Sequence, residues 1–171
     1  KMSTGSTLPH ELGHAYLLHK ANFNNEPNIF IEAYSIFIEF IFGDYLKNTR
    51  YSGVAYSSEY QRLDSFLGMI DYEFANLSRL KDMYFTFPFY YYSDGSLARI
   101  DSAKMILSDM LGMYFVSLYR FDKKKYNIMM SAFLDMYGKV TDEEILKYFK
   151  LSNLVDGSID TLDTYVKTYR R

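Results

Sequence analysis

The sequence predicts an all-α fold, a bundle of several helices within one domain. Two observations support this prediction. Apolar residues recur along most of the chain at the three- and four-residue spacing of a helix, and capping residues and glycines separate the helical segments. With 171 residues, 49% of them hydrophobic, the chain is long and apolar enough to form a substantial core, which excludes a disordered protein.

The predicted helices follow one another with short breaks. The first begins at about Leu8, with Thr7 as its cap and Pro9 in its first turn, where proline is tolerated. The complete set covers approximately residues 8–21, 28–47, 59–81, 96–119, 123–137, a short stretch after Thr141, and 158–169.

Local signals mark several of these boundaries. Ser58 and Ser158 are candidate N-caps. Gly138 is suited to the position that follows a helix, where the backbone turns left-handed. Thr141 and Glu144 form a capping box, in which each side chain accepts a hydrogen bond from the backbone N–H of the other residue at the start of a helix.

Two segments differ from the amphipathic pattern of the rest. Residues 28–47, NIFIEAYSIFIEFIFGDYLK, are apolar almost all round, so we expect a buried, central helix. Residues 83–95, MYFTFPFYYYSDG, are ambiguous, because strand-forming residues are interrupted by Pro88 and followed by an Asp-Gly turn signal.

Composition excludes several classes of function. A net charge of −2 gives no support for nucleic-acid binding, which needs a basic face. No apolar run has the length of a bilayer span and the N-terminus does not resemble a signal peptide, so we predict no membrane partner. The absence of Cys is compatible with the cytoplasm, which is the predicted location, and it restricts any zinc site to His and carboxylate ligands.

The stretch LPHELGHAYLLHK, residues 8–20, contains all three histidines of the chain. His10 and His14 are four residues apart and lie on one face of a helix, which lets both imidazoles bind one zinc ion. Glu11 lies about 100° around the helix from His10, so it reaches a water on the metal rather than the metal itself. The pattern predicts a metal site with Glu11 as general base. The alternative is two surface histidines on an amphipathic helix.

Zinc in a catalytic site needs a third protein ligand. His19 is about 180° from His10 on a continuous helix and does not meet this need. Glu32 and Glu39 lie seven residues apart on one face of the apolar 28–47 segment, where a carboxylate without a partner is costly. We favour Glu32 as the third ligand and Glu39 as the group that orients a ligand histidine. In the alternative, this face simply meets solvent.

The motif STLPHELGHAY, followed by IEAYSIFIE, resembles the metal-binding core of the oligoendopeptidase F and thimet oligopeptidase-like zinc metallopeptidases. That family has a T-L-x-H-E-x-G-H helix and then a helix of roughly E-x-x-S-x-x-x-E. The resemblance implies a zincin-like helical bundle, Zn²⁺ bound by His10, His14 and Glu32, and Glu11 as general base. The matching residues are Thr7, Leu8, His10, Glu11, Gly13, His14, Glu32, Ser35 and Glu39.

A second part of the resemblance concerns the tyrosine-rich segment. FPFYYYSDG is similar to the family's Y-x-Y-x-T-G stretch and places Tyr90 and Tyr92 at the tyrosine positions and Gly95 at the glycine. The resemblance implies that a tyrosine hydroxyl there stabilises the oxyanion of the attacked carbonyl. The alternative is that these tyrosines only pack in a strand-like turn.

The sequence also departs from the family. Pro9 replaces an ordinary residue, Leu17 stands where the family has a further His, and the His upstream of the tyrosines aligns with Asp82. Family members are several times longer and have an N-terminal part that closes a substrate channel. We therefore expect residues 1–171 to be the catalytic C-terminal portion of such a protein.

Three hypotheses about function follow. The first is a zinc metallopeptidase that hydrolyses short peptides by attack of zinc-bound water, with Glu11 as general base. The second is a binding or interaction module that keeps the metal-binding scaffold without turnover. The third is a helical domain with a fortuitous motif. Two His and one carboxylate also suit divalent ions other than zinc.

Overall fold

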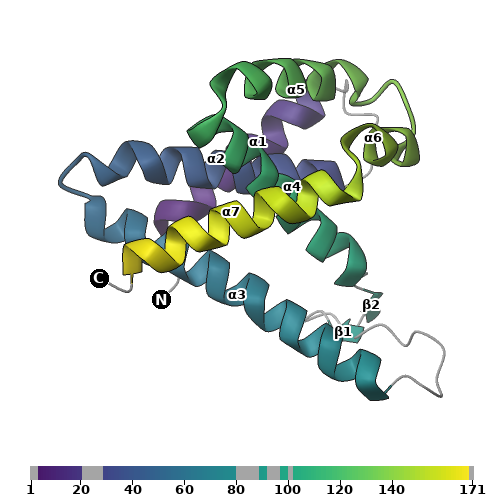
Figure 1. Ribbon diagram of the computed structural model, residues 1–171, viewed down its shortest axis with the longest axis horizontal. Coiled ribbons are helices and arrows are strands. Elements are labelled where there is room, and N and C mark those ends of the chain that lie inside the picture. Colours follow the sequence, from purple (N-terminus) through teal and green to yellow (C-terminus); the bar gives the residue numbers. More distant parts are fainter. Residues whose placement is uncertain (1–3, 21–28, 80–88, 92–96, 100–101, 170–171) are drawn as a thin grey trace.

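The computed structural model describes residues 4–20, 29–79, 89–91, 97–99 and 102–169 (Figure 1). This part of the chain is helical apart from one short hairpin, so the predicted helical class is confirmed. The helices are α1 (Thr4–Lys20), α2 (Ile29–Lys47), α3 (Ser52–Arg79), α4 (Ser102–Phe121), α5 (Lys123–Met136), α6 (Asp142–Phe149) and α7 (Leu151–Tyr169).

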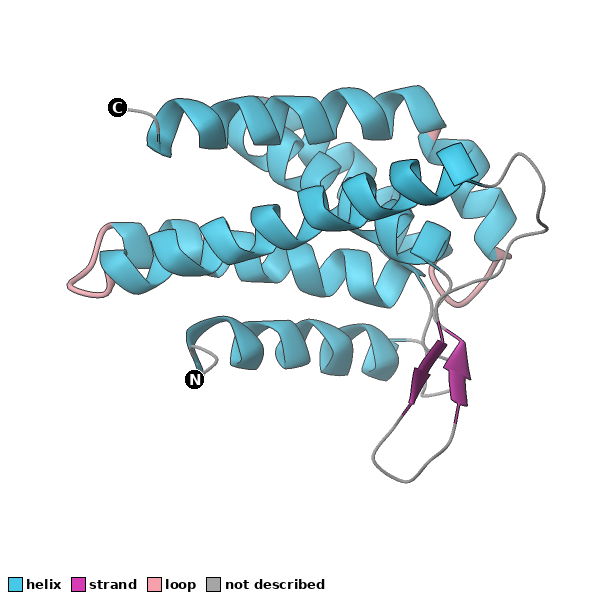
Figure 2. Ribbon diagram, turned by 90° about the horizontal axis from the view of Figure 1, so that it is seen from below, coloured by secondary structure: helices cyan, strands magenta, loops and turns pink. Residues whose placement is uncertain are grey.

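The hairpin lies at one end of the bundle (Figure 2) and consists of β1 (Phe89–Tyr91) and β2 (Leu97–Arg99). The strands are antiparallel, with Phe89 opposite Arg99 and Tyr91 opposite Leu97. The predicted start of a helix at about residue 96 was therefore wrong. Residues 97–99 pair with β1, which satisfies their backbone groups without a helix, and α4 begins at Ser102.

Helix α2 is the centre of the bundle, as its apolar sequence predicts. It packs against α1, α3 and α4, and α4 packs against α7 on its other side. The aromatic side chains between these helices form one connected cluster. Phe37 contacts Phe115 edge-to-face with ring centroids 6.1 Å apart, and Phe115 contacts Phe149 at 5.5 Å. Phenylalanines provide most of this buried cluster, whereas several tyrosines of the described helices, such as Tyr45 and Tyr51, are exposed.

Several local predictions are confirmed at the C-terminal half of the fold. Gly138 has φ 77° just after α5, which is the left-handed conformation expected of it. The backbone N–H and the hydroxyl of Thr141 both donate to Glu144 Oε2, at 2.9 and 3.0 Å, and the N–H of Glu144 donates back to Thr141 Oγ1 at 3.3 Å. These bonds form the predicted capping box at the start of α6.

Besides α4, three further helices start elsewhere than predicted, namely α1, α3 and α7. Helix α1 begins at Thr4, so Thr7 is not its cap and Pro9 lies beyond the first turn. Helix α3 begins at Ser52 rather than after Ser58. A tight turn starts it, in which the N–H groups of Val54 and Ala55 both donate to the carbonyl of Tyr51, at 3.0 and 3.2 Å.

Helix α7 shows why one of these predictions failed. Ser158 was expected to cap it, but the helix starts at Leu151 and Ser158 lies in its interior. The Ser158 hydroxyl is buried and donates to the carbonyl of Met110 on α4, 3.3 Å away. A serine that suits a cap by sequence is used instead to join two helices.

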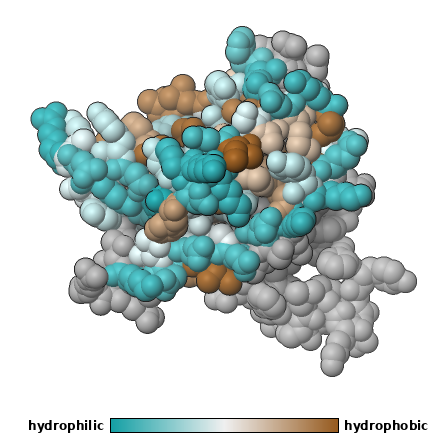
Figure 3. Space-filling model, turned by 45° about the horizontal axis from the view of Figure 1, so that its top comes forward, coloured by the Kyte–Doolittle hydropathy of each residue, from teal (hydrophilic) through white to brown (hydrophobic). Residues whose placement is uncertain are grey.

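The surface view in Figure 3 is mostly hydrophilic with scattered apolar patches. Among the helices that the structure describes, none combines the length and the hydropathy that a bilayer crossing requires.

An ion cluster joins α2, α3 and α4 at the end of α2. The Arg120 guanidinium donates to both oxygens of Asp44, at 2.7 and 2.8 Å, and to Glu59 at 3.0 Å. Lys47 lies 2.5 Å from Glu59 and 3.0 Å from Asp44. Burial by itself raises the pKa of Asp44, but the hydrogen bonds from Arg120 and Lys47 outweigh burial and hold this pKa below its usual value.

We predict that Asp44→Asn lowers the free energy of unfolding at neutral pH by about 1–3 kcal/mol, because it weakens a bidentate bond to a half-buried guanidinium. A depressed carboxyl pKa stabilises the fold above the unfolded pKa of about 3.9 and loses that effect as pH falls below it. Wild type should therefore lose more stability than Asp44→Asn between about pH 5 and about pH 2. Urea unfolding at several pH values measures this, with the exposed Asp64→Asn as control. Equal losses in wild type and Asp44→Asn would contradict the prediction.

Candidate metal centre

The candidate site lies where α1 crosses α2. His10 of α1 contacts both Glu39 and Glu32 of α2, whereas His14, one turn later, contacts Glu32 alone. The contacts therefore run in opposite directions along the two helices, so α1 and α2 are antiparallel. This arrangement places the two predicted ligand histidines over the polar face of an otherwise apolar helix.

Gly13 makes this close crossing possible. A Cβ atom on Gly13 would lie 2.7 Å from the Cα of Ser35 and 2.8 Å from its hydroxyl oxygen, closer than real Cβ atoms approach other atoms. Ser35 itself is completely buried under α1. The face of α2 that carries Ser35 and Glu39 is thus covered rather than exposed to solvent, which removes the alternative interpretation of this face.

The imidazoles and the Glu32 carboxylate converge. The Nε2 atoms of His10 and His14 are 2.8 Å apart. One oxygen of Glu32 lies 3.4 Å from His10 Nε2 and the other lies 3.5 Å from His14 Nε2. All three side chains are partly accessible, Glu32 the most at 44%. The group that sequence spacing predicts is therefore assembled around one point at the surface.

The other nitrogen of His10 has its own carboxylate. Nδ1 of His10 lies 2.5 Å from Oε1 of Glu39, whose side chain is only 14% exposed. This ion-pair contact directs Nε2 of His10 at the point between His14 and Glu32, where Nε2 could bind a metal once it gives up its own proton. Metal-ligating histidines commonly have such a carboxylate partner on their second nitrogen, and it holds both the tautomer and the ring orientation.

The pKa values of His10, His14 and Glu32 reflect these contacts. Burial opposes protonation of His10, but hydrogen bonds to Glu32 and Glu39 outweigh it and raise the pKa of His10 to about 9. Burial lowers the pKa of His14. The hydrogen bond with His10 lowers the pKa of Glu32. A single positive charge is thus stabilised at the place where these three groups meet.

The donor set fits a divalent cation. Tetrahedral zinc with N and O ligands at 2.0–2.2 Å separates neighbouring ligand atoms by about 3.3 Å, and the separations of 2.8, 3.4 and 3.5 Å are close to this value. Ligand atoms of His10, Glu11 and His14 also lie within 4.8 Å of one another. These residues could hold a metal ion, and their chemistry alone does not determine which one.

Glu11 differs from the other acidic groups of the site because it is exposed. Its carboxylate lies within 4.8 Å of the ligand nitrogens of both histidines, so Glu11 could itself be a ligand, and its predicted role as a base acting on a water stays a prediction. The group is close enough to contact a water beside the site while it remains open to solvent.

Two charged residues near the site were not predicted. Arg62 of α3 lies 3.1 Å from Asp109 of α4, and Asp109 is only 5% exposed. Burial raises the pKa of Asp109 to about 6; the Arg62 charge opposes this, and the charges of Glu39 and Glu32 add to it. The carboxylates of Glu32, Glu39 and Asp109 exceed the two positive charges of Arg62 and protonated His10 by one, and a cation would offset this excess. The sequence signal was Asp109 itself, an isolated acid in an apolar helix.

The structure describes little or nothing of the predicted residues in the tyrosine-rich segment and before it. The backbone of Tyr90 lies in β1, but its side chain is outside the part of the chain that the structure describes, as are the whole of Tyr92, Gly95 and Asp82. Their predicted roles therefore stay predictions. His19 is exposed on α1, as expected from its position on the helix opposite His10.

Comparisons with protein-family models, with curated proteins and with solved structures find no match for this chain. The chemistry of the site therefore rests on its geometry.

We predict that Gly13→Ala lowers both metal affinity and thermal stability. The added methyl group has to displace Ser35, which moves the histidines of α1 away from Glu32, and overpacking of this kind costs about 1–3 kcal/mol. Zn²⁺ titration against a chromophoric chelator and thermal unfolding measure the two effects. Gly68→Ala on α3 is the matched control, because a Cβ atom at Gly68 meets nothing within 4 Å. A Gly13→Ala protein with unchanged affinity would show that the close crossing does not position the ligands.

Glu39→Gln should weaken Zn²⁺ binding by about 10–100-fold while the protein stays folded. The neutral amide no longer carries the negative charge that lies 2.5 Å from Nδ1 of His10, so the ring is held less firmly and Nε2 becomes less basic. Isothermal titration with Zn²⁺ measures the affinity, and circular dichroism checks the fold. The role assigned to Glu39 is wrong if the affinity of this variant equals that of wild type.

Proposed function

We propose that this chain is a zinc-dependent metallopeptidase that hydrolyses peptide bonds in short peptides. The observation that carries the proposal is the convergence of His10, His14 and Glu32, within 3.5 Å of one another, beside the accessible carboxylate of Glu11. Two histidines and one acidic ligand with an adjacent glutamate are a ligand set of hydrolytic zinc sites.

A zinc ion held by these residues would supply Lewis-acid chemistry to the peptide carbonyl and would make the attacking water more acidic. The protein residues have separate tasks. His10, His14 and Glu32 would provide the ligand atoms, and Glu39, whose carboxylate lies against Nδ1 of His10, would hold the ring with Nε2 toward the ion. Gly13 keeps α1 close enough to α2 for these groups to meet.

Glu11 is the proposed general base. Its carboxylate accepts a proton from the attacking water and then donates that proton to the amine nitrogen of the leaving peptide, which regenerates the carboxylate. Exposure suits this role, because the group has to contact both water and substrate. The hydroxyl of Tyr90 or Tyr92 remains the predicted donor to the oxyanion.

The substrate class follows from the resemblance to the oligoendopeptidase F and thimet oligopeptidase-like enzymes, whose zincin-like bundle the helical fold is proposed to share. The resemblance includes both helices of the site, α1 and α2, and each motif residue that it assigns to the metal lies at the crossing of these helices. Short peptides are therefore the proposed substrates.

The decisive experiment compares wild type with Glu11→Gln. We expect wild-type protein loaded with Zn²⁺ to cleave quenched fluorescent peptides, and Glu11→Gln to bind Zn²⁺ normally but to cleave at least about 100-fold more slowly, the typical contribution of a general base. His10→Ala should lose both metal and activity. Asp64→Asn is the control, because it removes an exposed carboxylate of α3, outside the helices α1 and α2 that carry the site. This variant should behave as wild type.

The outcomes separate the three hypotheses. If wild type binds metal but does not cleave the peptides, or if Glu11→Gln cleaves them as fast as wild type, the peptidase proposal is overturned. Metal binding without cleavage would support a non-catalytic metal-binding module. Absence of metal binding in wild type would support a helical domain with a fortuitous motif.

A further inference from the structure

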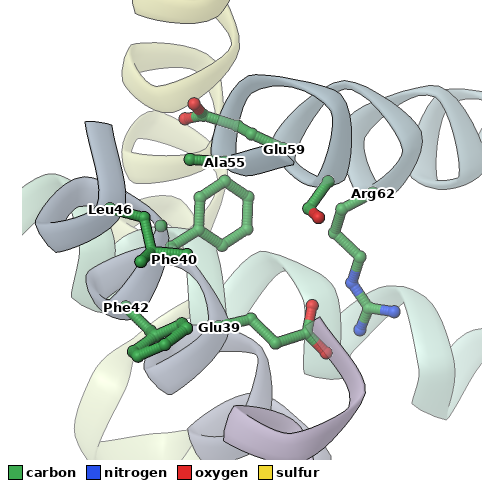
Figure 4. Close-up of a pocket in the computed structure, with 9 residues that line it drawn as sticks. Glu39, Phe40, Phe42, Leu46, Ala55, Glu59 and Arg62 are labelled. Carbon is green, nitrogen blue, oxygen red and sulfur yellow. The ribbon is translucent and has the colours of Figure 1, made fainter. Parts of the chain in front are cut away.

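A small pocket lies between α2 and α3, with Glu39 and Arg62 at one end (Figure 4). The rest of its wall is mostly apolar and includes Phe40, Phe42, Leu46 and Ala55. The space inside has room for about one water, which is too little for a side chain or a small molecule. The apolar surface that a partner could reach lies instead on the outer side of α1.

Helix α1 presents large apolar side chains away from the bundle. Its buried side consists of Pro9, Gly13 and Leu17. It packs mainly against α2, and Figure 2, in which N marks its start, shows the other helices on one side of it only. Leu8, Leu12 and Tyr16 are exposed and recur every four residues, so they form one ridge that spans about 80° of the helix. The outer side of a surface helix is normally polar, so this ridge needs an explanation.

The ridge continues onto α2. The ring of Tyr16 stacks on that of Tyr34, with centroids 5.6 Å apart and planes inclined by 22°. Because α1 and α2 are antiparallel, one turn back along α1 corresponds to one turn onward along α2, which places Ile38 near Leu12. Tyr45 follows on the same face of α2 as Tyr34 and Ile38. We call this surface the apolar edge, and it consists of Leu8, Leu12, Tyr16, Tyr34, Ile38 and Tyr45.

The charge pattern around the apolar edge favours a protein partner over a membrane. All six residues of the edge are uncharged. Helix α1 contains one lysine, Lys20, and one acid, Glu11, each about 80–100° around the helix from Leu12. An anionic membrane surface would need a cluster of basic side chains beside the apolar residues. The same edge of a second copy is apolar and uncharged, and a net charge of −2 repels another copy only weakly.

The area of the apolar edge is close to what a specific dimer requires. Its four most exposed members are Leu8 (65%), Leu12 (57%), Tyr16 (47%) and Tyr45 (69%). With about 150–250 Å² for each large side chain, these residues expose roughly 500 Å² per copy. Two copies that cover each other's edge would bury roughly 1,000 Å², which is at the lower end for specific interfaces.

We propose that two copies of this chain pair through the apolar edge, with their α1 helices antiparallel about a two-fold axis at Leu12. Leu12 then meets Leu12 of the partner subunit, and Leu8 meets Tyr16 of the partner subunit, because positions equally far from the axis face each other. Side chains four residues apart form ridges that fit between those of a facing helix. His10 and His14 lie at least about 160° around α1 from Leu12, so the pairing leaves the candidate metal centre open.

Analytical ultracentrifugation of wild type at about 5–500 µM measures the association. The buffer contains a chelator, so that metal ions cannot bridge the exposed histidines of two copies. Interfaces of roughly 1,000 Å² are weak, so we expect a reversible equilibrium between monomer and dimer with a Kd on the order of 10–100 µM.

Charge substitutions at Leu12 test the position of the axis. Leu12→Lys places two like charges against each other and should weaken the dimer at least about tenfold. Ile159→Lys on α7 is the matched control, because Ile159 is also 57% exposed and the variant adds the same charge. This control should dimerise as wild type does. Both positions are exposed, so neither variant should unfold, and circular dichroism checks this.

A mixture of two variants tests the symmetry. Leu12→Lys and Leu12→Glu in equal amounts should dimerise more tightly than either variant alone, because opposite charges then meet at the axis. The mixture is compared with each separate variant at the same total concentration.

The inference is overturned if wild type stays monomeric over the whole range, if Leu12→Lys dimerises as tightly as wild type, or if the mixture gains nothing over its components. Association that continues beyond the dimer also contradicts it, because a two-fold pairing is closed. All of these results are obtained without metal or substrate, so they are independent of the peptidase proposal.

Discussion

The contact between Gly13 and Ser35 is the constraint on which the rest of the site depends. It lets the backbones of α1 and α2 approach closely enough for His10 and His14 to meet Glu32 across the helix crossing. A side chain on Gly13 would separate the helices by about the width of a methyl group. The ligand atoms would then lie too far apart for one ion, because metal–ligand distances vary by only a few tenths of an ångström.

Helix α2 combines three functions because it has neighbours on three sides. Toward α1 it presents Glu32 and Glu39, toward α4 it presents aromatic and aliphatic core residues such as Phe37, and toward α3 it forms the apolar pocket. Its acidic residues do not disturb the core, because each faces a histidine or a cation. The apolar sequence of this helix therefore reflects its central position, and its few polar residues coincide with the chemistry.

The negative charge around the metal centre is arranged in layers. Glu32 contacts both histidines at Nε2, and Glu39 contacts His10 at its other nitrogen, Nδ1. The negative charge of the buried Asp109 is partly offset by the positive charge of Arg62. An excess of buried negative charge is destabilising by itself, whereas beside a cation site it favours occupancy. Arg62 also lines the pocket between α2 and α3, so it belongs both to this layer of charges and to the wall of that pocket.

The sequence by itself determined the helical class, the central helix α2, the capping box of Thr141 and Glu144, and the convergence of His10, His14 and Glu32 at the candidate metal centre. These features depend on local periodicity and on side chains three, four or seven residues apart, which the helix repeat places on one face. The relation between His10 and Glu32 was less local, but it could be inferred because an acid on an apolar helix needs a partner.

Only the tertiary structure decided the start of α3, the continuation of α7 through Ser158, and the approach of Arg62 and Asp109 to the site. Each of these depends on residues far apart in the chain. A serine such as Ser158 favours a cap position in any sequence. Here its hydroxyl instead donates to the carbonyl of Met110 on the neighbouring helix α4, which only the tertiary structure supplies. The pocket beside Glu39 was hidden from the sequence for the same reason, because it exists only where α2 and α3 pack together.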